Sequence, residues 1–144
     1  MTDDRTFGRI LGETARNAHN LHLKLLSEAG TDFPRWVAFT LLAENQGTAA
    51  HDALVDDLGR RLETDRSAAA QIVHRMHADG HVARRDDDGT DRVELTAAGG
   101  EFLKGVRATV NQATSRLIGD LDPQAVETTM RVLRSVDDKA AALL

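Results

Sequence analysis

Residues 79–99 read DGHVARRDDDGTDRVELTAAG, and this stretch decides the fold. On either side of an Asp88-Gly89 pair, apolar residues alternate with polar ones, which is the pattern of a β-hairpin with Asp-Gly at its turn. Residues 65–78 before it have helical spacing, and Thr96 is suited to cap a following helix. The stretch therefore predicts a helix, a hairpin and a second helix in direct succession.

Before the hairpin, the apolar spacing predicts four helices. The first is a long helix over about residues 4–29, which Gly30 ends. The second begins at Asp32, with Pro34 in its first turn, and ends at residues 45–47. The side chains of this second helix are mostly apolar, so we expect it to be largely buried.

The third and fourth helices are joined by about five residues. We expect Thr48 to cap the third, which Gly59 ends, and Thr64 to cap the fourth, which runs from Asp65 to about Ala78. The fourth helix has one apolar face, formed by Ala69, Ile72, Val73 and Met76. Its other face carries small or hydrogen-bonding residues, namely Ser67, Ala68, Gln71, His74 and Arg75. Such an outer face suits entry into a DNA groove.

Two long helices follow the hairpin. The first starts at Thr96 and continues to Ile118, and the Asp122-Pro123 pair starts the second, whose apolar stripe reaches Leu144. The order of elements is that of a winged helix-turn-helix, in which two short helices are followed at once by a hairpin. We therefore expect a mainly α fold with a small β-hairpin.

Composition limits the chain to a few classes of protein. A length of 144 residues suits one compact domain, and the absence of cysteine excludes disulfides and thiolate metal ligands. We find no apolar run long enough to cross a bilayer and no secretory signal, so we expect a cytoplasmic protein with no membrane partner. The net charge of −5 argues against a simple nucleic-acid binder. From Arg60 to Arg92, however, seven arginines balance seven acidic residues, so the acidity lies elsewhere.

The hairpin region resembles the MarR family of winged helix-turn-helix regulators. Residues 79–85 resemble the family's D-G-hydrophobic-x-x-R-x strand, although His81 stands where an aliphatic residue is usual. Asp91-Arg92 resembles the Asp-Arg wing tip, and residues 95–99 match L-T-x-x-G. The resemblance implies one domain over residues 1–144, with the winged helix-turn-helix at about 33–96. It also implies that helices at about 4–29 and 97–144 form a homodimer.

The resemblance and the chemistry of the side chains together indicate a DNA-binding surface. Gln71 can pair with adenine and Arg75 with guanine or phosphate, while Ala68 lets the helix approach closely. Arginines of the hairpin would meet the backbone or the minor groove. The expected DNA-binding residues are Thr48, Ser67, Ala68, Gln71, His74, Arg75, Arg84, Arg85 and Arg92. A dimer then predicts a near-palindromic operator with half-sites about one turn, roughly 10 bp, apart.

Members of this family commonly bind small aromatic or phenolic anions near the dimer helices. The resemblance therefore implies a repressor that such a ligand releases from DNA. The candidate ligand-binding residues are Arg16, His19, His22, Trp36 and Phe39, in which a cation or imidazole would meet the anion and rings would meet its body. The alternative for Trp36 and Phe39 is a role in the core.

Other functions remain as alternatives. A winged-helix module that binds protein and not DNA is favoured by the neutral charge of residues 60–92. A hydrolytic triad of His51, Asp52 and Ser67 lacks a nucleophile elbow, so we do not expect an enzyme. The histidines at positions 19 and 22, and those at 74, 77 and 81, lack a local carboxylate that would complete a metal site. We expect neither a metal nor a cofactor.

Overall fold

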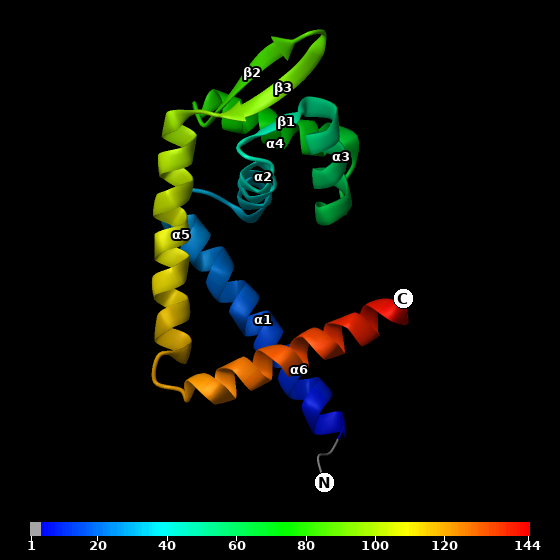
Figure 1. Ribbon diagram of the computed structural model, residues 1–144, viewed down its shortest axis with the longest axis vertical. Coiled ribbons are helices and arrows are strands. Elements are labelled where there is room, and N and C mark those ends of the chain that lie inside the picture. The colour runs from blue at the N-terminus through cyan, green and yellow to red at the C-terminus, as the bar shows by residue number, and fades with distance from the viewer. Residues whose placement is uncertain (1–3) are drawn as a thin grey trace. The chain divides into compact units, whose positions relative to one another are not determined.

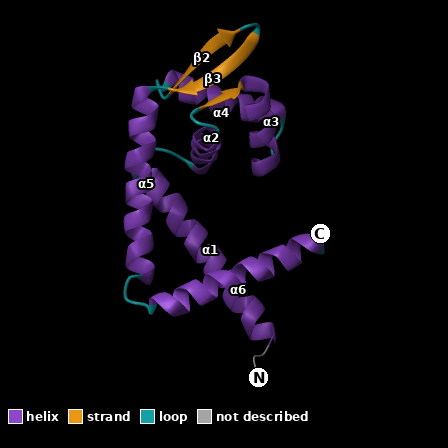
Figure 2. Ribbon diagram, viewed as in Figure 1, coloured by secondary structure: helices purple, strands orange, loops and turns teal. Residues whose placement is uncertain are grey.

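The computed structural model describes residues 4–144, which form helices and one small sheet (Figures 1 and 2). In chain order the elements are α1 (Asp4–Glu28), α2 (Phe33–Glu44), β1 (Thr48–Ala50), α3 (His51–Leu62), α4 (Arg66–Ala78), β2 (Val82–Asp87), β3 (Thr90–Leu95), α5 (Ala97–Ile118) and α6 (Pro123–Ala142). The predicted fold class, mainly α with a small β-hairpin, is confirmed. The chain divides into two compact units, one ending at Thr109 and the other covering Val110–Leu144, and each is described by itself.

The first unit is built around an apolar core from α2, α3, α4, the sheet and the start of α5. Phe39, Leu42, Leu58 and Met76 are the largest contributors, each no more than 1% exposed. Burial of one such side chain contributes about 1.5–3 kcal/mol, so this cluster dominates the stability of the unit. The core fixes α4 from its inner side and leaves the outer side to solvent.

The sheet has three strands in the order β1-β3-β2, with antiparallel pairing throughout. Asp88 and Gly89 form the predicted hairpin turn, and both have positive φ, at 48° and 82°. Such angles at both central positions are those of the tight turn that Asp-Gly favours. Strand β1 was absent from the prediction. It pairs with the other side of β3, so β3 is the central strand.

The predicted helix cap at Thr48 is wrong. Thr48 lies in β1 opposite Glu94, and α3 begins only at His51, after Ala50, which makes no side-chain capping bond. Pairing along β3 is favoured because it satisfies several backbone groups at once, and the Leu95 amide also donates to the Gly47 carbonyl at 2.8 Å. The strand and not a side chain therefore sets the start of α3.

The turn between α3 and α4 is shorter than predicted. Helix α3 continues through Gly59 to Leu62 and ends at Glu63, which takes the left-handed conformation with φ 50°. The cap of α4 is Asp65 and not Thr64, since the Asp65 carboxylate accepts from the Ala68 amide at 2.7 Å. Leu62 packs against the core, so extension of α3 buries another apolar side chain. The connection is therefore three residues, 63–65.

Two residues bind the end of the hairpin to α5. The Thr96 hydroxyl accepts from the Gly99 amide at 3.0 Å, which confirms the predicted cap, and donates to the Gly80 carbonyl at 2.6 Å. Gly99 lies against the backbone of His81, where a Cβ atom would come within 2.0 Å of the His81 carbonyl oxygen. This contact explains why the L-T-x-x-G pattern has a glycine at position 99.

The second unit, residues 110–144, contains the end of α5 and all of α6. The predicted start of α6 is confirmed, because the Asp122 carboxylate accepts from the Gln124 amide at 3.3 Å and Pro123 stands in the first turn. No residue of α6 is buried in this chain. Several large apolar side chains are at least 40% exposed, namely Leu117, Ile118, Leu121, Met130, Val132 and Leu133. This unit therefore presents an apolar surface.

Candidate nucleic-acid interface

Helix α4 separates its residues between two faces as the sequence predicted. Ala69, Ile72, Val73 and Met76 are buried against α2 and α3. On the outer face Ser67, Ala68, Gln71, His74 and Arg75 are all exposed. The helix is held from inside while its polar side is free, so the outer face can meet a partner without unfolding.

A small pocket joins α4 to the hairpin and to α3. It encloses about 250 Å³ and is lined by His51, Ser67, Ala70, Gln71, His74 and Arg84. These residues come from the start of α3, the outer side of α4 and strand β2. Four of the predicted DNA-binding residues, Ser67, Gln71, His74 and Arg84, are therefore brought together. His51, which we weighed only as part of a hydrolytic triad, belongs to the same surface.

The two faces of the hairpin carry different arginines. In antiparallel pairing, directly opposed residues share a face and neighbours along a strand alternate. Arg84 lies opposite Val93 and shares the face of the buried core residues, whereas Arg85 lies opposite Arg92 on the other face. Arg92 donates to the Thr48 hydroxyl at 3.3 Å, so Thr48 and Arg92 lie together. The predicted set is thus divided between two sides of the sheet.

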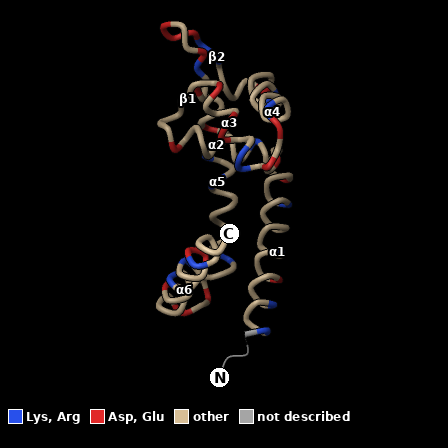
Figure 3. The backbone as a smooth tube through the Cα atoms, turned by 90° about the vertical axis from the view of Figure 1, so that its right-hand side faces the viewer, with Lys and Arg blue, Asp and Glu red and all other residues tan. Residues whose placement is uncertain are grey.

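Most arginines of this region form ion pairs with carboxylates. Among the seven arginines from Arg60 to Arg92, all but Arg92 form an ion pair with an acidic side chain. Arg84 binds Asp91, with a second contact from Arg84 Nε to Asp91 Oδ1 at 3.3 Å. This hydrogen bond lowers the pKa of Asp91 and raises that of Arg84, so both are charged near neutral pH. Figure 3 shows acidic positions at the hairpin tip close to basic positions on β2.

Arg66 and Arg75 are held in the same way at the two ends of α4. Arg66, at the start of α4, pairs with Asp56 and with Asp52 at 2.7 Å, both on α3. Arg75 reaches Asp32 at 3.7 Å, and Asp32 also caps α2 by accepting from the Arg35 amide at 3.0 Å. The arginines are oriented by the fold, and their charge is locally balanced.

Comparison with known proteins finds a family whose sequence model matches part of the chain. The sequence model of the MarR family matches residues 29–92, which span α2 to the wing. The segment from α2 to the wing is therefore similar to the MarR family. No curated protein matches the chain.

Solved structures extend the likeness to the whole fold. A MarR family protein from Bacillus stearothermophilus is 21% identical, with a TM-score of 0.80 over 98% of this chain and 99% of that chain. RV1404 from Mycobacterium tuberculosis is 15% identical, with a TM-score of 0.78 over 96% and 94%. The organohalide-sensing transcriptional regulator RdhR-CbdbA1625, bound to 2,4-dichlorophenol, is 12% identical, with a TM-score of 0.71 over 100% and 85%. At such identities these structures show a shared MarR fold.

The candidate ligand residues of this chain do not form one cluster. His19 and His22 contact the ring of Phe33 edge-on, with centroids 5.2 and 6.1 Å away, and His22 also meets Trp36 at 5.5 Å. Phe39 is buried in the core, where it contacts His81 and Phe102. Phe33 was not among the predicted ligand residues, because only the packing of the folded chain brings it against the two histidines.

His22 is the residue of this aromatic group with an unsatisfied polar atom. Its Nε2 atom is buried and has no hydrogen-bond partner. Burial, and secondarily the charge of His19, lowers the pKa of His22. The neutral ring is therefore favoured, and Nε2 is a polar atom without a hydrogen-bond partner inside this aromatic group.

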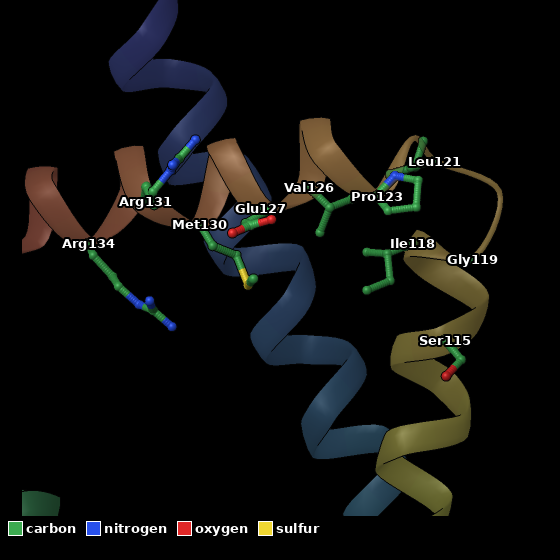
Figure 4. Close-up of a pocket in the computed structure, with 10 residues that line it drawn as sticks. All are labelled: Ser115, Ile118, Gly119, Leu121, Pro123, Val126, Glu127, Met130, Arg131 and Arg134. Carbon is green, nitrogen blue, oxygen red and sulfur yellow. The ribbon is translucent and has the colours of Figure 1, made fainter.

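Further hollows lie elsewhere in residues 4–144, and two of them are larger than the others. One, of about 530 Å³, lies beside α4 between Phe33, Leu62, Ala68 and Arg75. The other, of about 780 Å³, lies at the elbow between α5 and α6 (Figure 4). There Ile118 and Val126 point toward each other, and Met130 follows one turn along α6. None of the helices in residues 4–144 has the length and hydrophobicity that a membrane span requires.

Proposed function

We propose that this chain is a sequence-specific DNA-binding transcriptional regulator in which α4 reads the major groove. The observation that carries the proposal is the outer surface of α4, where Ser67, Gln71 and His74 stand free beside Arg84 of the wing. Gln71 offers a paired donor and acceptor to adenine, and Arg84 offers a charge to phosphate. The family match over residues 29–92 supports the same function.

The roles of the other predicted DNA residues follow from their faces. Ala68 allows close approach and Arg75 lies at the far end of the same exposed side, so both belong to the groove contact. Thr48, Arg85 and Arg92 lie on the other face of the sheet and would contact only flanking backbone. Arg84 is therefore expected to contribute more to DNA affinity than Arg85.

We infer a homodimer from the apolar surface of residues 110–144. Water would face Ile118, Leu121, Met130 and Leu133 in a single chain, and a second copy would cover them. Two copies make a near-palindromic operator the natural target, with half-sites about one turn, roughly 10 bp, apart. The single MarR-like domain of residues 1–144, with dimerisation helices at 4–29 and 97–144, is part of this proposal.

Oligomeric state tests the dimer directly. Met130→Glu places a charge within the exposed apolar surface of residues 110–144 and should give a monomer in sedimentation velocity. Thr128→Glu adds the same charge to α6 but lies two residues away, on another side of the helix, and should leave the dimer intact. A wild-type chain that sediments as a monomer would remove this part of the proposal.

DNA binding is tested by selection followed by titration. Duplexes selected on the wild-type protein from a randomised library are measured by fluorescence anisotropy against random-sequence duplex. We expect Gln71→Ala to relax preference at one or two positions by about tenfold, and Arg84→Ala to weaken all duplexes and flatten the salt slope by about 0.9. Arg85→Ala removes the same charge from the other face and serves as the matched control. Equal losses for Arg84→Ala and Arg85→Ala would contradict the proposed surface.

We further propose a repressor that a small aromatic or phenolic anion releases from DNA. The fold shared with a dichlorophenol-bound regulator supports this, as do the rings and unpartnered His22 Nε2 of the α1–α2 contact. With 2,4-dichlorophenol as the probe, DNA affinity of the wild type should fall, and His22→Leu should blunt that response. An unchanged affinity at millimolar probe would remove the phenol from the proposal.

The balanced charges favour a second function, a winged-helix module that binds protein in place of DNA. Six of the seven arginines in residues 60–92 already have carboxylate partners. If no duplex binds even at low salt, this function replaces the first.

A further inference from the structure

The pair between Arg84 and Asp91 occupies the position where the proposed surface would meet DNA. Arg84 lines the same pocket as Ser67, Gln71 and His74, so its guanidinium faces the side of α4 that is free. Asp91 binds that guanidinium through both carboxylate oxygens. A carboxylate in this arrangement has the geometry with which a phosphate would bind the same group.

Both partners remain open to solvent, so the pair can be exchanged. The Arg84 side chain is 43% exposed and that of Asp91 49%. Exposed ion pairs are weak, and the closed pair is favoured over the open one by about fivefold or less. A DNA phosphate can therefore displace Asp91, but at a cost in affinity.

The hairpin also has contacts that do not involve Asp91. Asp91 lies opposite Asp86 in the strand register, and like charges at opposed positions weaken a hairpin. The turn is secured independently, because the Asp86 carboxylate accepts from the Gly89 amide at 2.9 Å. Arg84 offsets the repulsion between the two aspartates, while replacement of Asp91 by a neutral residue removes it.

We propose that Asp91 is an internal competitor for DNA phosphate at Arg84 and so sets the affinity of the wing for the DNA backbone. This inference rests on the proposed DNA-binding function. In the free protein the Asp91 carboxylate binds the Arg84 guanidinium, and on DNA binding a phosphate takes the place of that carboxylate. Because Asp91 balances the charge of Arg84, the sequence-independent attraction between the wing and DNA stays low.

The test measures random-sequence duplex binding over a salt series from about 50 to about 200 mM. Asp91→Asn should raise affinity about threefold to fivefold at the low end, with a log–log salt slope steeper by up to about 0.9. Asp87→Asn is the matched control, since it removes the same charge from the wing tip, where Asp87 lies opposite Thr90 while Arg84 and Arg85 pair with Asp91 and Glu94. In an Arg84→Ala background, Asp91→Asn should have no effect.

The outcomes separate this inference from the proposed function. If the wild type binds duplex and Asp91→Asn binds no better, or gains no more than Asp87→Asn, the competitor role is wrong while DNA binding stands. A loss of affinity in Asp91→Asn would show that Asp91 orients Arg84 for DNA, which also overturns it. If neither protein binds any duplex, both proposals fail. Thermal melting of each variant establishes that the wing is folded.

Discussion

The junction between the wing and α5 gives the sharpest stability test. A methyl group at residue 99 would place Cβ 2.0 Å from the His81 carbonyl oxygen and 2.8 Å from its carbon. Ordinary contacts lie at 3.4–4 Å, and the neighbours here are backbone atoms that cannot rotate away. In Gly99→Ala, either α5 or the start of the wing must therefore move.

The cost of this movement can be estimated from its parts. Overpacking of this kind costs about 3 kcal/mol at the upper end of its usual range. The hydrogen bond from the Thr96 amide to the His81 carbonyl, 3.0 Å long, would also be strained, at about 1 kcal/mol. Alanine regains about 1 kcal/mol of helix propensity, which leaves a net loss of about 3 kcal/mol. For a chain of this size, that lowers Tm by about 9 °C.

The next residue provides the control. Gly100 stands in the same helix, and a Cβ there would have nothing within 4 Å. Gly100→Ala should therefore gain only the helix propensity and raise Tm by about 3 °C. Far-UV circular dichroism melts at equal protein concentration measure both, because an oligomer melts at a concentration-dependent temperature. A Gly99→Ala protein that melts within about 2 °C of the wild type would refute the reasoning.

Three further measurements probe the same unit. Thr96→Val removes a helix cap and a bond to Gly80, so urea unfolding should show a loss of about 1–2 kcal/mol, whereas Thr114→Val, whose hydroxyl bonds only within its helix, should change little. Because burial lowers the pKa of His22, stability that is complete above the unfolded value of 6.5 should decline as pH falls from 6.5 toward the folded pKa, and His22→Leu should lose this part of the pH dependence in melting curves. NMR titration should find the pKa of Asp91 below the ordinary aspartate value, and Arg84→Ala should raise it back toward that value. The stability contributed by the Arg84–Asp91 pair is therefore present above the ordinary value and is lost as pH falls through the folded pKa. A pKa of Asp91 that does not change in Arg84→Ala would contradict the assigned cause.

Local patterns in the sequence predicted the elements that local chemistry decides. The two faces of α4, the Asp88-Gly89 turn and the caps at Asp32, Thr96 and Asp122 all follow from spacing and side-chain type. The caps at Thr48 and Thr64 were wrong because neighbouring contacts decide among several suitable residues. Strand β1 has only three residues, and its pairing with β3 depends on a partner more than forty positions away.

The candidate site was harder to predict because register and distant pairs define it. Arg84 and Arg85 look alike in sequence, and only the strand pairing places one beside α4 and the other on the far face. Arg75 and Asp32 come from separate helices, and no spacing rule would join them. Phe39 has the same residue type as Phe33 but packs into the core, where His81 stacks on Phe102 at 4.4 Å.

The strand order has a consequence for how molecules of this protein avoid one another. A sheet of this size has two open edges, and unpaired backbone there can recruit strands from other chains. One edge is β1, which is too short at three residues to template a long pairing. The other is β2, whose sequence Arg84-Arg85-Asp86-Asp87 places full charges along the exposed rim. The hairpin can therefore project into water without seeding aggregation.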